Sequence, residues 1–141
     1  MSTYVREKVL RVPMKRIDLN YIKSVIAQKY PNANHEDDFS WYLDSALPDV
    51  FDYGTVGKFQ IAPTYENFFD YVLEYEWDMD GEYGKARALY DSEKAKYLPI
   101  FQQIDPNIDM SYVRLVEFCW YNGGGAPDYY DDANDSFYDE V

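Results

Sequence analysis

Cysteine and histidine are almost absent from this chain of 141 residues, which contains one of each. A single cysteine, Cys119, cannot form an internal disulfide, and this fits a reducing compartment. Cys119 lies in an apolar stretch and His35 lies in the polar sequence NANHEDD, so neither is placed as a reactive thiolate or its base would be. Two such dissimilar sites also cannot supply a well-formed transition-metal centre. We therefore expect no catalytic residue, no metal and no other cofactor.

Long apolar runs are missing as well. No stretch approaches the ~18 consecutive apolar residues that a membrane-spanning helix needs. The first residues, MSTYVREKVLRVPMKR, lack the apolar core of a signal peptide. These two absences predict a cytoplasmic protein that does not enter a membrane.

Familiar catalytic and ligand-binding motifs are absent too. The chain has no G-x-S-x-G sequence, and its triple glycine, NGGGAPD, is not followed by the Lys-Ser/Thr pair of a phosphate loop. The sequences DMDGE and DPNID alternate acids as a calcium loop does, but the later Gly and Glu of such a loop are missing. Carboxylates are abundant enough that a glycosidase-like pair stays open.

Basic residues are scarce after the first quarter of the chain. Residues 1–35 contain seven Lys and Arg against two acids, whereas residues 36–141 contain six against twenty-four. The net charge is −13 and the pI is about 4.3. A field of this sign repels DNA, RNA and anionic membranes, and it attracts basic proteins or cations. We therefore expect a basic protein as the partner, with no direct nucleic-acid contact; the oligomeric state stays open.

Aromatic residues, by contrast, make up 19% of the chain and hydrophobic residues 47%. This composition predicts a folded domain, because disordered chains are poor in aromatics. We expect residues 1–126 to form a single domain and residues 127–141 to form an acidic, aromatic tail. Within that tail we expect Tyr129 and Tyr130 to pack against the domain while the last residues stay mobile.

The residue patterns predict an α+β fold, in which a small, mostly antiparallel sheet packs with about four helices. The expected strands are 4–12 at a charged sheet edge, 58–61, and 110–122 in the sheet interior. The expected helices are 18–30 with Asp18 as its cap, 37–48, 64–81, and 82–103, which Pro99 ends or kinks.

The predicted helix 64–81 carries the most specific charge pattern. Glu66, Asp70, Glu74 and Asp78 recur at every fourth position, so on a helix they would form one slowly spiralling stripe. No Lys or Arg occurs between residues 60 and 83, and each like-charge pair would destabilise the helix by ~0.2–0.5 kcal/mol. Two interpretations follow: the basic segment 1–35 (or water) neutralises the stripe, or the stripe imitates a row of phosphates.

The second interpretation predicts a protein that binds and inhibits a basic, nucleic-acid-handling protein by DNA or RNA mimicry. Counter-defence proteins of phages and mobile elements, and immunity proteins that mask nuclease toxins, fit this charge and size. The candidate partner-binding residues are Glu66, Asp70, Glu74, Trp77, Asp78, Asp80, Glu82, Asp128, Asp131 and Asp132. The alternatives are a general acidic interaction module without mimicry and a small carbohydrate-active enzyme.

Overall fold

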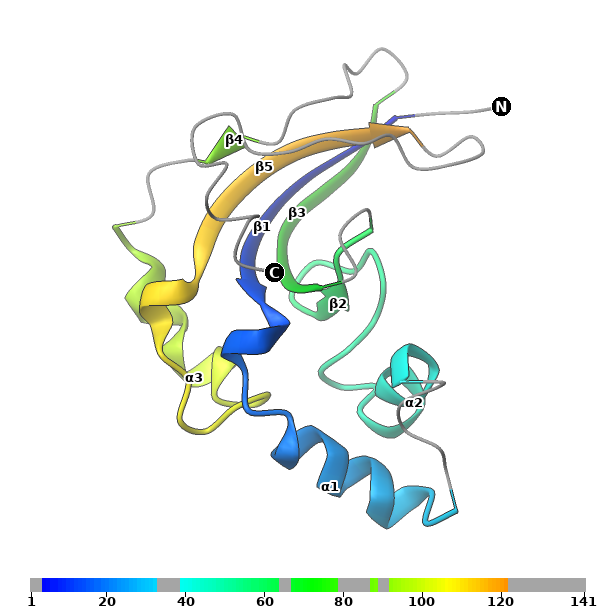
Figure 1. The fold of residues 1–141 in the computed structure, drawn as a ribbon. Helices are drawn as coiled ribbons and strands as arrows, with labels where there is room; N and C mark the ends of the chain where they lie inside the picture. The colour runs from blue at the N-terminus through cyan, green and yellow to red at the C-terminus, as the bar shows by residue number, and fades with distance from the viewer. Residues whose placement is uncertain (1–3, 33–38, 64–66, 79–86, 89–91, 122–141) are drawn as a thin grey trace.

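The computed structural model describes residues 4–32, 39–63, 67–78, 87–88 and 92–121. Its centre is one antiparallel sheet with the strand order β2-β3-β1-β5-β4. The strands are β1 (Tyr4–Pro13), β2 (Phe59–Ile61), β3 (Phe68–Asp78), β4 (Arg87–Ala88) and β5 (Arg114–Tyr121). In Figure 1 the long strands β1, β3 and β5 run side by side and bend together.

Three α-helices accompany the sheet in the described part of the chain: α1 (Asn20–Lys29), α2 (Phe39–Ala46) and α3 (Leu98–Phe101). Three short 3-10 turns join them, η1 (Met14–Arg16), η2 (Lys94–Tyr97) and η3 (Met110–Tyr112). The helices α1 and α2 lie beyond one end of the long strands (Figure 1). The predicted α+β class and antiparallel sheet are therefore confirmed, with three helices instead of about four.

Each face of the sheet has its own cluster of buried residues. Alternate side chains of a strand point to opposite faces, so Leu10 and Val12 of β1 share one face while Val9 and Arg11 share the other. Leu10 and Val12 belong to the main core, which also contains buried residues from all three helices; we call this side the helix face. The opposite face has its own buried cluster, formed by Val5, Val9, Ala62, Phe68, Val72, Val116 and Phe118.

Helix α1 forms where the sequence predicts it, for local reasons. Ile22 and Ile26 are one turn apart, and both are completely buried. The Asp18 carboxylate accepts a hydrogen bond of 3.0 Å from the backbone N–H of Asn20, which satisfies one of the free donors at the helix start. Helix α2 also confirms its prediction, with Leu43 and Ala46 buried.

The prediction of a helix over 64–81 is wrong, because residues Phe68–Asp78 form strand β3. Phe68, Phe69 and Val72 are completely buried, and they lie on both faces of the sheet, an environment that favours a strand over an amphipathic helix. The register against β1 shifts between Lys8, which faces Glu74, and Val9, which faces Val72. Leu73 is therefore an extra residue, a β-bulge, and the alternation of side chains reverses across it. The helix-like spacing of the apolar pairs 68/69 and 72/73 comes instead from apolar packing on both faces of the strand, because both pairs occur before the alternation reverses.

Three other expectations need correction. The predicted helix 82–103 is replaced, in its described part, by the short strand β4, the turn η2 and the four-residue helix α3. Pro99 lies in the first turn of α3, where its missing N–H has no intrahelical acceptor to lose, so it starts a helix instead of ending one. Strand β1 is the central strand, not an edge. Strand β5 is interior as predicted, although it begins only at Arg114.

Candidate functional site

The predicted site residues divide into two groups. Six of them lie outside the described residues, as does the tail: Glu66, Asp80, Glu82, Asp128, Asp131 and Asp132. The other four, Asp70, Glu74, Trp77 and Asp78, belong to β3, with Asp78 as its last residue opposite Tyr4. A carboxylate stripe on a helix therefore does not exist, and the β3 residues need to be placed one by one.

Asp70 is part of the core and not of the surface. Its carboxylate accepts two hydrogen bonds from Arg11, one of 2.7 Å from Nε and one of 2.8 Å from Nη2. Both side chains are 0% exposed. The guanidinium carbon of Arg11 also lies 4.7 Å from the ring centroid of Phe118 and 5.8 Å from that of Phe68. Asp70 is thus removed from the candidate partner-binding residues, because a partner cannot reach it.

Glu74 lies on the other side of the sheet from Asp70, since the bulge separates them. Its Oε1 is 4.0 Å from Nζ of Lys8, and the neighbouring Glu76 is 3.5 Å from Nη1 of Arg6. The Glu74 and Glu76 side chains remain 70% and 62% exposed. Such exposed ion pairs contribute only ~0–1 kcal/mol. Their geometry nevertheless matches the first interpretation of the sequence, because the basic segment lies directly alongside these acids.

The charge of the molecule is divided unevenly between its described and remaining parts. The described residues contain thirteen acids and twelve Lys and Arg, so they are close to neutral. The other thirteen acids, accompanied by Lys85 as the single base, belong to the segments outside the described residues. The excess negative charge that indicates a basic partner is therefore carried by those segments and not by the sheet.

Two tryptophan side chains are exposed in the described part of the chain, which is unusual for so large an apolar residue. Trp77 is 58% exposed at the end of β3, with its ring centroid 6.2 Å from that of Tyr75. Trp41 of α2 is also 58% exposed. Exposed tryptophans often serve as anchors in protein interfaces. The sequence placed Trp41 within the expected helix 37–48 but gave no sign that its side chain would be exposed, so Trp41 was not among the candidate residues.

A polar network lies buried beneath the turn between α2 and β2. The Gln60 side chain donates from Nε2 to Oε1 of Glu7 at 2.8 Å, and its own Oε1 accepts from the backbone N–H of Gly54 at 2.8 Å. Glu7 is 0% exposed and Gln60 is 2% exposed. Burial, followed by the charge of Glu7, raises the pKa of the Tyr53 and Tyr75 hydroxyls. Because the charge of Glu7 acts on the Tyr53 hydroxyl, we infer that this end of the side chain points toward the network, although almost half of Tyr53 is exposed.

A wide, open cavity of about 740 Å³ lies beside α2, and we call it the α2 cavity. It is lined by Met14, Phe39, Ser40, Trp41, Asp44, Tyr53, Ile61, Ala62, Pro63 and Asn67. A smaller hollow of about 70 Å³ shares four of these residues and reaches Gln60 of the buried network. The volume is in the range of small-ligand sites, and aromatic rings with a few polar groups are the usual lining of such sites.

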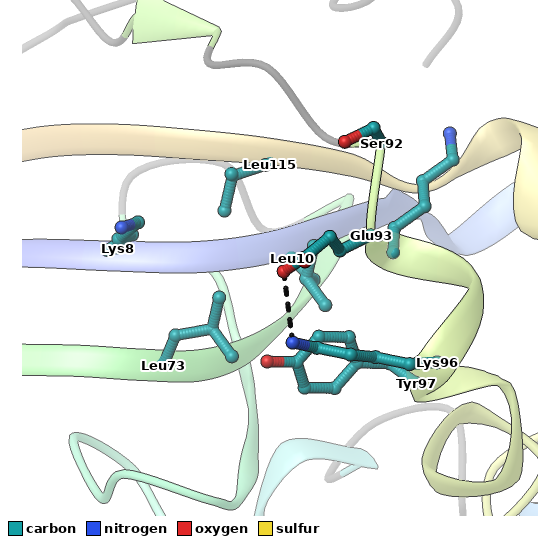
Figure 2. A pocket seen from close by; sticks show the side chains of 9 residues that line it. Lys8, Leu10, Leu73, Ser92, Glu93, Lys96, Tyr97 and Leu115 are labelled. Atoms are coloured by element: carbon teal, nitrogen blue, oxygen red, sulfur yellow. Dashed lines mark hydrogen bonds and ion pairs between the residues drawn. The ribbon is translucent and has the colours of Figure 1, made fainter.

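A second cavity, of about 270 Å³, lies between the sheet and η2 (Figure 2). Leu10, Leu73 and Leu115 line it from three adjacent strands, and Tyr97 lies across from them. Its three lysines already have partners: Lys94 Nζ donates to the Val113 carbonyl at 2.6 Å, Lys96 pairs with Glu93 at 3.1 Å, and Lys8 lies beside Glu74. This cavity therefore offers no uncompensated charge from its lysines.

Comparison with known proteins gives no relative: no protein-family model, curated protein or solved structure matches this chain significantly. Within the described residues, no helix is both long and apolar enough to cross a membrane. The same residues contain no group of three side chains from His, Cys, Asp and Glu that is suited to a metal ion. Cys119 is buried, and His35 lies outside the described residues.

Proposed function

We propose that this protein binds a basic, nucleic-acid-handling protein and inhibits it by competing with nucleic acid. The observation that carries this proposal is the uneven division of charge. Acids and bases nearly balance in the described part of the chain, while the remaining segments contain thirteen acids and one base. A concentration of uncompensated carboxylates attracts basic surfaces and releases counterions on binding, as a nucleic acid does.

The mimicry in this proposal differs from the helical stripe that the sequence predicted. Asp70 is buried, and Glu74 has Lys8 beside it, so β3 does not present a regular row of free carboxylates. Competition would instead arise from the acidic segments, of which PDYYDDANDSFYDEV is the longest. Exposed aromatic anchors such as Trp77 would add the apolar contact that charge alone does not provide.

A general acidic interaction module is the second candidate, and the cross-strand pairs of Glu74 and Glu76 favour it. These acids are offset by Lys8 and Arg6, so a partner need not treat β3 as a phosphate strand. The two candidates differ in one property. A nucleic-acid competitor shares its binding surface on the partner with DNA or RNA, whereas a general module does not.

Capture from the cytosol of the native host separates these candidates. The full chain is immobilised at low salt, and the bound proteins are eluted either with duplex DNA or RNA, or with an equal concentration of phosphate ions as the control. The proposal predicts that a basic nuclease, helicase or similar protein elutes with nucleic acid and not with the control. Elution of basic proteins that nucleic acid leaves bound would contradict competition and support the general module.

A further inference from the structure

The described lining of the α2 cavity combines exposed aromatic rings with one carboxylate, that of Asp44. Ser40 and Asp44 are one turn apart on the outer side of α2, since Leu43 and Ala46 occupy its inner side. Among the described residues that line the cavity, Asp44 is the only charged one. Trp41 and Tyr53 add rings that are 58% and 49% exposed.

None of the ion pairs among the described residues involves the carboxylate of Asp44. The charge of another acid, Asp52, acts on this carboxylate, and the Asp52 carboxylate accepts a hydrogen bond of 2.7 Å from the Thr55 hydroxyl. Partial burial, and then the charge of Asp52, raise the pKa of Asp44. The carboxylates of Asp44 and Asp52 thus act together without an ion-pair partner among the described residues, so a cation placed beside Asp44 would be stabilised.

The Trp41 ring is held in place by its neighbours while much of its surface stays open. Its centroid lies 5.8 Å from that of Tyr30 and 4.8 Å from that of Tyr42, both in edge-to-face geometry. Aromatic faces attract cations through the ring quadrupole, and Trp does so most strongly. A fixed, exposed indole beside an uncompensated carboxylate is the arrangement that suits an alkyl cation.

We propose that the α2 cavity binds the guanidinium or ammonium group of an Arg or Lys side chain from the basic partner, with Asp44 pairing the charge and Trp41 stacking on it. The proposal rests on the proposed function for the identity of the partner, and it adds a specific anchor point to a binding mode otherwise governed by net charge. Tyr53 and Phe39 would enclose the aliphatic part of the side chain.

A small probe tests the site without any partner protein. The full chain is titrated with N-acetyl-arginine amide, and with N-acetyl-citrulline amide as its neutral control of nearly the same shape. Binding is followed by NMR through the indole N–H signal of Trp41 and the backbone N–H signals of α2, and the backbone signals also report binding in a variant that lacks Trp41. We expect the arginine probe to bind more tightly than the citrulline probe, and we expect Asp44→Asn to weaken the arginine probe by about two- to fivefold, the range for an exposed cation contact.

Two matched variants remove trivial explanations. Asp49→Asn makes the same charge change at an exposed acid that does not line the cavity, and Tyr21→Ala removes an exposed aromatic ring of α1 that does not line it either. Neither should weaken the arginine probe, whereas Trp41→Ala should. Equal binding of the two probes, or equal effects of Asp44→Asn and Asp49→Asn, would overturn the proposal. Thermal melts of each variant confirm that the fold is retained.

The source of the cation is tested on the captured partner. Asp44→Asn should weaken partner binding more than Asp49→Asn does; equal effects would show that the cavity does not receive a partner side chain. The two proposals fail separately. If the probe binds as expected but no captured protein is displaced by nucleic acid, the proposed function fails and the cation site stands. If a partner that competes with nucleic acid is found but Asp44→Asn does not weaken binding of the arginine probe, only the cation site fails.

Discussion

Among single residues, the buried pair of Arg11 and Asp70 has the greatest effect on the fold. Two opposite charges lie at 0% exposure in the centre of the sheet, joined by two short hydrogen bonds. Removing both charges from water is unfavourable, and the pair offsets this only while it is intact. The same chemistry at Arg6 and Glu76, where water remains in contact, matters far less.

Substitution of these acids should reveal the difference. Asp70→Ala removes the carboxylate that binds the buried Arg11 guanidinium, so we expect the free energy of unfolding to fall by ~3–5 kcal/mol. Glu76→Ala removes an exposed partner and should lower it by less than ~1 kcal/mol. Urea unfolding of the two variants measures both values. Similar losses in the two variants would show that Asp70 is not buried against Arg11.

Buried tyrosine hydroxyls should make the protein sensitive to alkali. Burial raises the pKa of Tyr53, Tyr71 and Tyr75 above the ordinary value of 10.0. In the unfolded chain these hydroxyls lose their protons near pH 10, whereas the folded protein still holds them. Stability is therefore complete below about pH 9 and falls as the pH rises through about 10.

Tyr53→Phe removes one of these protons, so the decline in stability between about pH 9 and 11 should be shallower than in the parent protein. The difference in stability between Tyr53→Phe and the parent at pH 7, well below the range in which tyrosines titrate, is the internal control. The measurement is the free energy of unfolding in urea across this pH range. A slope that Tyr53→Phe leaves unaltered would contradict a buried hydroxyl.

The sequence predicted which residues carry charge but not which of them meet. Asp70 and Glu74 have the same local pattern, yet one is buried and the other is exposed. Their partners, Arg11 and Lys8, come from a strand about sixty residues earlier, as the separation of 59 for Arg11 and Asp70 shows. Helical spacing is a local property, so it could not reveal a contact that depends on strand pairing.

At the level of elements, β3 determines how the acids are presented. The strand pairs with β1 along its whole length, and the bulge at Leu73 moves the following acids to the helix face. Helix α1 was predictable because its Ile22 and Ile26 pattern is local and its cap is adjacent. Strand β3 was not predictable in this way, since a strand that packs apolar residues on both faces repeats them in adjacent pairs four positions apart, which is also a helical spacing.

A charge-reversal cycle tests the register of β1 and β3. Arg6→Glu and Glu76→Arg each place like charges opposite one another, so each should lower stability by ~0.2–1 kcal/mol. The double variant restores an opposite pair and should recover most of this loss. The free energy of unfolding of all four proteins gives the coupling. Strictly additive effects would contradict the pairing of these two residues.

The turn before β2 depends on a glycine for two reasons that can be separated. Gly54 has a φ of +69°, and a Cβ added there would lie 3.1 Å from Cζ of Tyr75. Gly57 has a φ of +86°, but its added Cβ would meet nothing nearer than 3.9 Å. Both positions therefore disfavour alanine through the backbone, and Gly54 adds a steric conflict.

We expect Gly57→Ala to lower the free energy of unfolding by ~1–2 kcal/mol, the usual penalty for a left-handed backbone. Gly54→Ala should lower it further, because the Tyr75 ring has to move and the hydrogen bond from Gly54 to Gln60 is disturbed. Thermal unfolding of the two variants compares them directly. A smaller loss for Gly54→Ala than for Gly57→Ala would show that Tyr75 does not pack against the turn.

On the scale of the whole molecule, the sheet and helices are nearly neutral, and the remaining segments carry almost all of the net negative charge. This division could be counted from the sequence only after the structure showed which ranges form the sheet. This division bears on function, because Asp70, Glu74 and Glu76 of β3 are paired with residues of β1 and the excess charge belongs to other segments. Competition for a basic partner should then depend on those segments.

One measurement tests this claim most directly, namely the affinity for the captured basic partner in the presence of a DNA or RNA competitor. The full chain is compared with a variant carrying Asn at Asp128, Asp131 and Asp132, and with a control variant carrying Asn at Asp49 and Asp109 and Gln at Glu93. Both variants lose the same charge, but the control loses it from exposed acids of the described residues. We predict that the first variant binds more weakly, has a shallower dependence on salt and displaces less nucleic acid, while the control stays closer to the parent. Equal behaviour of the two variants, or binding that nucleic acid does not affect, would contradict the proposed function.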